Sequence, residues 1–363
     1  MARLKTKAFG VVGILAAAFA GPAFADHHVP VSDAEMGASD MAEEPFVRPD
    51  VRAYLDKLAA NPRPAMTAEM LAMIRKLPPE MMKPVDDAPI GDLGEIRDVK
   101  MPGPGGEISL RLYDSRPAGE REPGPVIVFY HGGAFVVGSI DTHAGLTAEM
   151  ARQLDLPVIS VEYRLAPEHP WPAAPDDAEA AARWVAENGA AFGREFTGLV
   201  ISGDSAGGNL TLVTTLALRD RPAALPVVMQ LPIYPSSDRT KVYPSREMFG
   251  EGYGLGNGSV PQTDFYKAEK TSWRASPLLA NLHDLPPTVL VTASLDPLRD
   301  EGRAFAAKLI KAGVPTTYFE AHGNIHGFAT YRKAIPSARE DTAEFLALAE
   351  TMLENVTEKQ ADN

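Results

Sequence analysis

The segment LVISGDSAGGNL at residues 199–210 gives the clearest indication of how this 363-residue chain folds. An apolar run leads straight into Gly203-Asp-Ser-Ala-Gly207, a G-x-S-x-G pattern, and a helix-compatible stretch leaves it. A sharp strand–turn–helix of this kind exposes the serine hydroxyl above a sheet, because the flanking glycines let the backbone pass without a Cβ clash. Ser205 is therefore the candidate nucleophile, and the N–H of Ala206 would face a developing oxyanion. The alternative is a glycine-rich turn that only packs closely.

Short, continuously apolar runs recur on both sides of this segment. They lie at residues 126–130, 158–161, 227–231 and 289–292, and a further strand is predicted at 316–319. Helical patterns separate most of them, at about 145–154, 174–188, 206–218 and 299–312. Apolar strands that alternate with helices predict an α/β fold with a mainly parallel sheet covered on both faces. Residues 108–113 alternate as a half-buried strand does, after a predicted turn at 101–106.

A second glycine-rich stretch, His131-Gly132-Gly133-Ala134, follows the apolar run at 126–130. It occupies the position at which lipases and esterases carry an H-G-G-G oxyanion loop. Small residues let a substrate carbonyl approach the backbone amides, so Gly132, Gly133 and Ala134 are predicted oxyanion donors together with Ala206. Alanine keeps its N–H but loses the easy access to positive φ that glycine has. We expect His131 to brace the loop and not to carry protons.

The acid and the base should follow the nucleophile in chain order. Asp296 ends the run at 289–295, and Pro297 after it can fix the direction of the carboxylate. Asp300 and Glu301 compete for this role, but they begin the next helix, where the helix dipole favours acidic residues. For the base, His326 in the sequence NIHGF is favoured over His322, which precedes it in the same predicted loop.

The N-terminus predicts export. Three basic residues, an apolar run at 8–20 and the sequence Ala-Phe-Ala at 23–25 indicate a signal peptide over residues 1–25, cleaved on the way to the periplasm or the medium. The alternative is an uncleaved membrane anchor, whose span would have to include several glycines and a proline. We expect no stable membrane insertion after cleavage.

The rest of the chain divides into an acidic extension at 26–47, the N-terminal part of a helical cap at 48–92 and a catalytic domain at 93–363. Helical patterns lie at 49–60 and 67–77, with Thr67 as N-cap. A stretch rich in glycine, proline and aromatic residues at about 236–274 interrupts the catalytic domain as a second part of the cap. The Gly252–Gly258 segment inside it superficially suggests a phosphate loop, but it follows no strand, which favours a lid loop.

The charge and composition of the chain restrict the kinds of partner and cofactor that it can bind. The formal net charge of −13 argues against nucleic acid or an anionic membrane surface as partner. The chain has no cysteine, which excludes a thiolate nucleophile, disulfides and cysteine-bound metals. We expect a small-molecule ester substrate, no cofactor and no metal. The sequence leaves a monomer and a homodimer both open.

Five blocks together resemble the hormone-sensitive-lipase-like esterases of the α/β-hydrolase superfamily, from about Val47 to the C-terminus. They are HGGA at 131–134, YRLAPEHP at 163–170, GDSAGGN at 203–209, DPLRDEG at 296–302 and HGF at 326–328. The resemblance implies an eight-stranded sheet, a helical cap and serine carboxylesterase activity on small, short-acyl esters. It also implies that Arg164 and Glu168 support the active-site loops. Ala134 and the acidic extension depart from the family pattern.

Two other interpretations of the function remain open from the sequence. A lactonase, a deacetylase or a peptidase could use the same Ser205, Asp296 and His326, because the cap and the acyl pocket select the substrate. A non-catalytic ligand receptor could also keep the fold.

Overall fold

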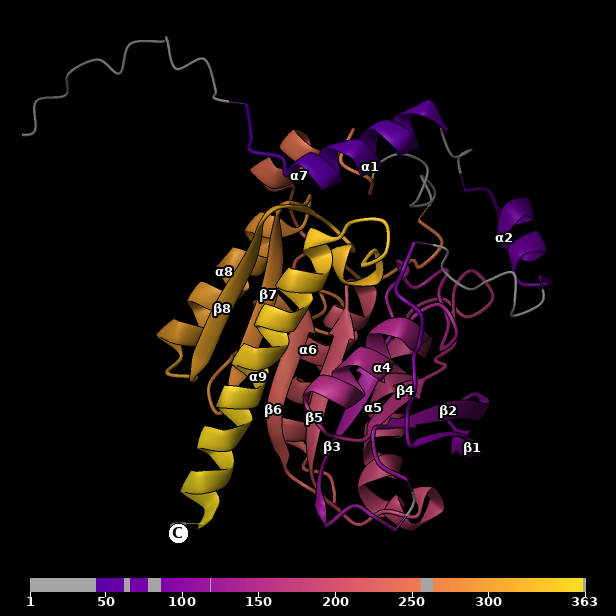
Figure 1. Ribbon diagram of the computed structural model, residues 1–363, viewed down its shortest axis with the longest axis vertical. Helices are drawn as coiled ribbons and strands as arrows, with labels where there is room; N and C mark the ends of the chain where they lie inside the picture. Colours follow the sequence, from indigo (N-terminus) through magenta and orange to yellow (C-terminus); the bar gives the residue numbers. More distant parts are fainter. Residues whose placement is uncertain (1–43, 62–65, 78–85, 118, 256–263, 362–363) are drawn as a thin grey trace, which may run out of the picture. The chain divides into compact units, whose positions relative to one another are not determined.

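The computed structural model describes residues 44–61, 66–77, 86–117, 119–255 and 264–361 (Figure 1). The predicted signal peptide at 1–25 lies outside these residues, as do residues 26–43 of the predicted extension. Within the described ranges, no helix combines the length and the apolar character needed to cross a membrane.

An eight-stranded sheet, in the order β1-β2-β4-β3-β5-β6-β7-β8, organises the described chain. Its strands are β1 (Glu95–Gly103), β2 (Gly106–Asp114), β3 (Gly124–Tyr130), β4 (Val158–Val161), β5 (Phe196–Asp204), β6 (Val227–Ile233), β7 (Thr288–Leu295) and β8 (Thr316–Ile325). The β1–β2 and β2–β4 pairs are antiparallel, and the other five pairs are parallel. The predicted α/β fold with a mostly parallel eight-stranded sheet is confirmed.

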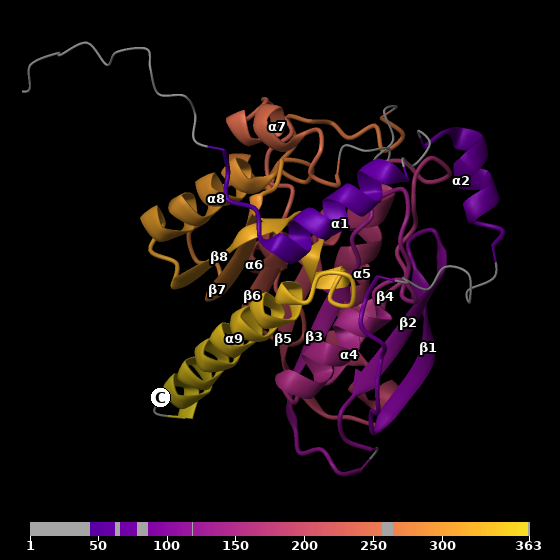
Figure 2. The same ribbon diagram turned by 45° about the horizontal axis from the view of Figure 1, so that its top comes forward.

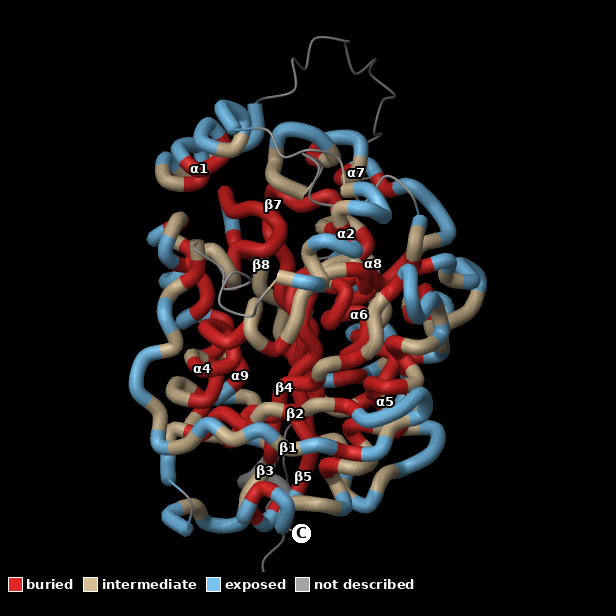
Figure 3. Tube along the Cα trace, turned by 90° about the vertical axis from the view of Figure 1, so that its right-hand side faces the viewer, coloured by how far each residue is buried: buried red, intermediate tan, exposed pale blue. Residues whose placement is uncertain are grey.

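Both faces of this sheet are covered because its inner strands are apolar on both sides. Along β3, Ile127 and Phe129 pack into one core cluster, whereas Val126 and Val128 pack into another. Successive side chains of a strand point to opposite faces, so each cluster needs its own layer of helices. The first lies under α4 (Ala144–Gln153) and α9 (Ser337–Ala361), and the second under α5 (Ala173–Glu187) and α6 (Ala206–Asp220) (Figures 1 and 3). A third cluster lies between α6, α8 (Arg299–Lys311) and β7 on the same face as the second.

Two elements were not anticipated from the sequence. β1 is an edge strand in which Met101 is the one fully buried residue, so it lacks the apolar pattern that marks the inner strands. The predicted turn at 101–106 is shorter than expected, since β1 continues to Gly103 and β2 begins at Gly106.

The long C-terminal helix α9 was not predicted from the sequence either. Strand β8 extends six residues past the predicted 316–319, to Ile325.

The N-terminal helices pack on this domain as expected. Helix α1 (Pro49–Ala60) matches the predicted range and buries Val51, Tyr54 and Leu55 in the cluster shared with α4 and α9. Figures 1 and 2 show α1 crossing the top of the sheet. Helix α2 (Ala68–Ile74) is shorter than predicted, and the Thr67 side chain caps it by accepting the Met70 N–H at 3.2 Å.

The described part of the excursion between β6 and β7 carries one α-helix, α7 (Pro244–Phe249), and one short 3-10 helix at Pro277–Leu279. The rest is irregular chain that reaches the edge of the sheet where the parallel strands end. Its side chains line the cavity described below.

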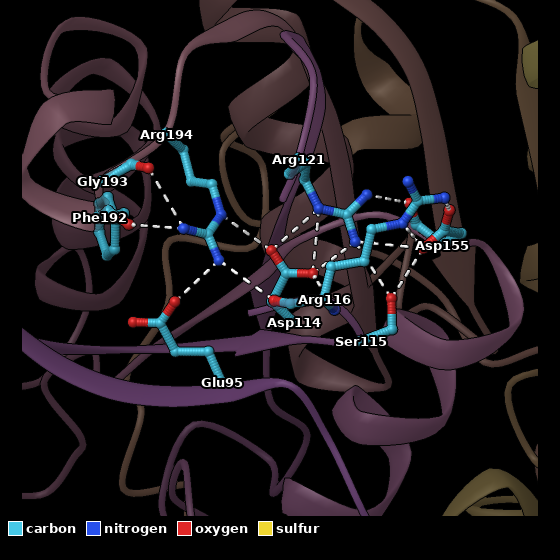
Figure 4. A network of polar contacts seen from close by, with 9 residues as sticks. All are labelled: Glu95, Asp114, Ser115, Arg116, Arg121, Asp155, Phe192, Gly193 and Arg194. Atoms are coloured by element: carbon cyan, nitrogen blue, oxygen red, sulfur yellow. Dashed lines mark hydrogen bonds and ion pairs between the residues drawn. The ribbon is translucent and has the colours of Figure 1, made fainter. Parts of the chain in front are cut away.

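A buried charge network fastens the far end of β2 (Figure 4). Asp114 is completely buried and accepts hydrogen bonds from the guanidinium groups of Arg121 and Arg194, each with Nε at 3.0 Å. Arg194 also donates to Glu95 on β1 at 2.8 Å. Two nearly buried guanidinium groups therefore share the Asp114 carboxylate, and each has one further carboxylate partner among the described residues, Glu95 for Arg194 and Asp155 for Arg121.

Asp114→Asn is expected to lower the free energy of unfolding by about 3 kcal/mol, because it removes the fully buried carboxylate that two nearly buried guanidinium groups share. Of the described carboxylates, only Glu95 then remains paired with Arg194, and only Asp155 with Arg121. Urea unfolding measures this loss. Asp98→Asn is the matched control: its side chain is 64% exposed beside Arg111, and its loss should stay near or below about 1 kcal/mol. Equal losses in the two variants would contradict this account.

Candidate active site

The turn at Ser205 brings the nucleophile candidate above the sheet. Ser205 follows β5 directly and precedes α6, with φ 56° and ψ −112°, a strained backbone conformation for a residue with a side chain. A Cβ on Gly203 would lie 2.5 Å from the Tyr130 carbonyl oxygen, and one on Gly207 only 1.8 Å from it. Glycine is therefore required on both sides of the serine, as the motif predicts.

The structure brings Ser205, His326 and Asp296 together. His326 Nε2 lies 2.8 Å from Ser205 Oγ, and His326 Nδ1 lies 2.7 Å from Asp296 Oδ2. Asp296 is fully buried, and its second oxygen accepts the Leu298 N–H at 2.7 Å. Each residue directly follows the end of a parallel strand: β5, β8 and β7 respectively. Because parallel strands end at the same edge of a sheet, residues far apart in sequence meet there.

The competing residues lie elsewhere. Asp300 accepts the Ser245 N–H at 2.9 Å, and Glu301 accepts the Ser237 N–H at 3.0 Å, so both acids hold the excursion and not the imidazole. His322 is exposed and stacks on Phe46, with ring centroids 5.1 Å apart.

Three consecutive residues in and just after the oxyanion loop have positive φ values. Gly133 has φ 121°, Ala134 has 55° and Phe135 has 64°. Ala134 thus adopts the left-handed region in spite of its Cβ, at a cost of about 1–2 kcal/mol. In the described residues, the N–H groups of Gly133, Ala134 and Ala206 have no hydrogen-bond acceptor, which leaves them available to a ligand oxygen.

Gly132 corrects one expectation. Its N–H donates to Asp204 Oδ1 at 2.7 Å and also lies 3.2 Å from His143 Nε2. This donor is committed inside the protein, so the prediction that Gly132 supplies an oxyanion donor is wrong. Gly132 instead ties the oxyanion loop to the residue just before the nucleophile.

Sequence reasoning did not identify the partner of this contact. Asp204 and His143 form a buried pair with Nε2 and Oδ1 3.1 Å apart. Burial alone would lower the pKa of His143, but the Asp204 carboxylate outweighs it and raises that pKa. Burial likewise opposes ionisation of Asp204, yet His143 and the Gly132 amide hold its pKa below the usual value. The pair is therefore a buried ion pair below the raised pKa of His143.

Three residues around the loop act as supports. Burial, with His143 nearby, lowers the pKa of His131 to about 3, so this imidazole is neutral, and it stacks on Tyr163 with centroids 4.2 Å apart. Arg164 donates two hydrogen bonds to the Asp177 carboxylate, from Nε at 2.8 Å and from Nη2 at 2.7 Å. Glu168 accepts a bond from Arg75, just after α2, at 2.6 Å. These contacts agree with the bracing expected of His131, Arg164 and Glu168.

Tyr234 is a further neighbour that no motif marks. Its buried ring lies 4.8 Å from the His326 ring, between centroids, and its hydroxyl reaches Asp204 Oδ2 at 3.4 Å. It thus contacts both the imidazole and the ion pair.

A cavity of about 500 Å³ opens on Ser205. Its walls come from the oxyanion loop, the start of α6, the excursion between β6 and β7, and Leu298. Within the described ranges, no group of three histidine, aspartate or glutamate side chains is arranged to hold a metal ion.

Comparisons with known proteins agree with this geometry. A family model described as alpha/beta hydrolase fold matches residues 127–330. The carboxylesterase NlhH of Mycobacterium tuberculosis is 33% identical over 85% of this chain and 98% of its own length. The ethyl acetate hydrolase of Pseudomonas putida is 35% identical over 65% of this chain and 76% of its own.

Among solved structures, an ester hydrolase from the metagenome of Lake Arreo, complexed with a bipyridine phosphonate derivative, superposes with a TM-score of 0.75. It shares 37% identity over 84% of this chain and 99% of its own. The resemblance indicated by the sequence blocks is confirmed, and the chain belongs to the α/β-hydrolase family, among the hormone-sensitive-lipase-like esterases.

Proposed function

We propose that this protein is a serine carboxylesterase that hydrolyses small, short-acyl esters through an acyl-serine intermediate. The observation that carries the proposal is the continuous hydrogen-bonded chain from Asp296 through His326 to Ser205, at 2.7 and 2.8 Å, at the mouth of a cavity. The relatives named esterase and carboxylesterase support the reaction class.

The tautomer of His326 follows from its neighbours. Asp296 accepts the Nδ1–H, which leaves the Nε2 lone pair facing the Ser205 hydroxyl. As Oγ attacks the ester carbonyl carbon, Nε2 takes the hydroxyl proton, and Asp296 stabilises the resulting imidazolium. Because Asp296 is buried and held by the Leu298 N–H, it fixes the ring without solvent competition.

The amides of Gly133, Ala134 and Ala206 receive the negative charge that develops on the carbonyl oxygen. Donors of this kind contribute about 3 kcal/mol each when they are fixed in advance. The imidazolium then gives its proton to the departing alkoxide, so the first product is an alcohol. Water, deprotonated by the same Nε2, attacks the acyl-serine, and the acid leaves as Ser205 regains its proton.

The ion pair of Asp204 and His143 positions the oxyanion loop in this scheme. It holds the Gly132 amide, one residue before the first donor, at a fixed distance from the Ser205 turn. Nucleophile and oxyanion donors therefore share one buried anchor.

The short-acyl preference rests on two observations. The cavity has a volume of about 500 Å³, and the bulky side chains of Phe135 and Leu298 are among those that line it. The Pseudomonas putida relative is named for ethyl acetate, a very small ester.

A fluorophosphonate probe is expected to label the wild-type protein once, at Ser205. Ser205→Ala should remove the label and lower kcat on nitrophenyl acetate on the order of 10⁴-fold or more. Mass spectrometry of the labelled peptide and a rate assay give the two readouts, with an unchanged urea midpoint as the folding control. An unlabelled wild-type protein would favour a ligand receptor.

The His143 ion pair should leave a pH signature on stability. Since the pKa of His143 is raised in the folded state, the stabilisation is complete below its unfolded pKa of about 6.5 and is lost as pH rises through the folded value. The difference in free energy of unfolding between wild type and His143→Gln should therefore shrink as the pH rises through the folded-state pKa of His143.

Urea unfolding across this range measures the difference. His283→Gln, which removes an exposed histidine, is the matched control and should show no such trend. A wild-type advantage over His143→Gln that stays constant with pH would refute the charged pair.

A further inference from the structure

The cavity that opens on Ser205 carries charge opposite to that of the whole chain. Among the described residues that line it, four are cationic, Arg239, Lys241, Arg246 and Lys270, and one is acidic, Asp264. The formal net charge of the protein is −13. A concave wall of one sign concentrates the field inside it, so this cavity attracts anions although the protein as a whole is acidic.

Arg239 is the most informative of the four. It is partly buried, and its Nε is fully buried without a hydrogen-bond partner in the described chain. Its guanidinium carbon lies 5.6 Å from the centre of the Tyr266 ring, and none of the described carboxylates pairs with it. Buried polar groups are nearly always paired, so an unpaired one calls for an explanation.

Other arginines in this protein follow the ordinary rule. Arg164, Arg194 and Arg332 each hold a carboxylate at 3.0 Å or less. The segment 256–263, which lies outside the described residues, contains no aspartate or glutamate that could pair with Arg239. Among the described residues, Arg239 Nε is therefore an open donor in a cavity-lining side chain.

The remaining cations are weakly compensated. The nearest carboxylate oxygen to Arg246 is Glu301 Oε2 at 3.5 Å, and burial raises the pKa of Glu301 to about 7. Lys241 Nζ lies over the Tyr243 ring, 4.5 Å from its centre, and Lys270 is exposed. Asp264, also exposed, accepts the Lys267 N–H at 3.1 Å.

An apolar surface continues from this charge toward the nucleophile. Tyr266 stacks flat on Phe135 of the oxyanion loop, with ring centroids 3.9 Å apart and planes 2° apart. The Arg239 guanidinium thus lies beside the ring that packs against the oxyanion loop. A ligand with an anionic end at Arg239 and an apolar body against Tyr266 and Phe135 fits this part of the cavity.

On the basis of the esterase function above, we propose that the preferred substrates are esters bearing a free carboxylate, which Arg239 binds while the lysines draw the anion into the cavity. The planar guanidinium matches a carboxylate with two parallel N–H···O bonds. The carboxylate takes no part in the reaction. Water still cleaves the ester bond through Ser205, and the acid or the alcohol product keeps the extra charge.

The test compares two esters that differ only in charge: the mononitrophenyl ester of adipic acid and the nitrophenyl ester of its monoamide. Wild-type kcat/KM should favour the carboxylate ester about tenfold or more, the gain expected of one charged hydrogen-bonded contact. The preference should fall when NaCl rises from about 0.02 M to about 0.5 M, as screening predicts.

Variants locate the effect. Arg239→Met should reduce the carboxylate-to-amide ratio about tenfold, and Arg239→Lys should keep part of it. Lys311→Gln, a cation removed from the exposed end of α8, is the matched control and should keep the wild-type ratio. If Arg239→Met does not fold, the double variant Lys241→Gln with Lys270→Gln should still lower the ratio and its salt dependence.

Each outcome decides between the claims. A wild-type ratio near one, with both esters hydrolysed, overturns the carboxylate preference and leaves the esterase function intact. Turnover of neither ester overturns both. A ratio that Arg239→Met leaves unchanged removes Arg239 from the proposal, and stronger turnover of a phosphonate-tipped ester would replace carboxylate as the ligand class.

Discussion

The hydrogen bond between His326 Nε2 and Ser205 Oγ, 2.8 Å long, depends on where three parallel strands end. β5, β7 and β8 deliver Ser205, Asp296 and His326 at one edge of the sheet, each as the first residue after its strand. The turn after β5 places Ser205 above the sheet edge only because Gly203 and Gly207 have no Cβ. A Cβ at either position would clash with the Tyr130 carbonyl oxygen. The apolar strands and the helical layers therefore serve the site by fixing this edge, and the strain at Ser205 is stabilised by the packing around it.

Buried charge is handled in two different ways in this molecule. Asp114, Asp177 and Asp204 are buried and each is paired with a cation, which fixes an edge of the sheet or the oxyanion loop. The cavity differs from this arrangement, because among the described residues no carboxylate pairs with the Arg239 guanidinium, and Lys241 and Lys270 add positive charge to the cavity wall. In the first case charge stabilises the fold, and in the second it remains available to a ligand.

The sequence predicted most of the fold because its inner strands are continuously apolar and its helices are amphipathic. The triad residues could be named because each belongs to a short local motif at a strand end. β1 escaped because an edge strand with exposed charged residues carries no such pattern. The commitment of the Gly132 amide to Asp204 could not be foreseen either, since these residues are separated by 72 positions and only the register of β3 beside β5 joins them. The pairing of His143 with Asp204 likewise joins residues far apart in the sequence, so no local motif predicts it.

The central claim is that Ser205 becomes covalently acylated during turnover. Rapid acid quenching of the protein with a nitrophenyl ester, followed by mass spectrometry of its peptides, tests this most directly. The account predicts one acyl group per chain, on the peptide that holds Ser205, formed together with a burst of one equivalent of nitrophenol when deacylation is the slower step. An acyl group on another residue, or steady turnover with no acylated peptide at any quench time, would contradict it.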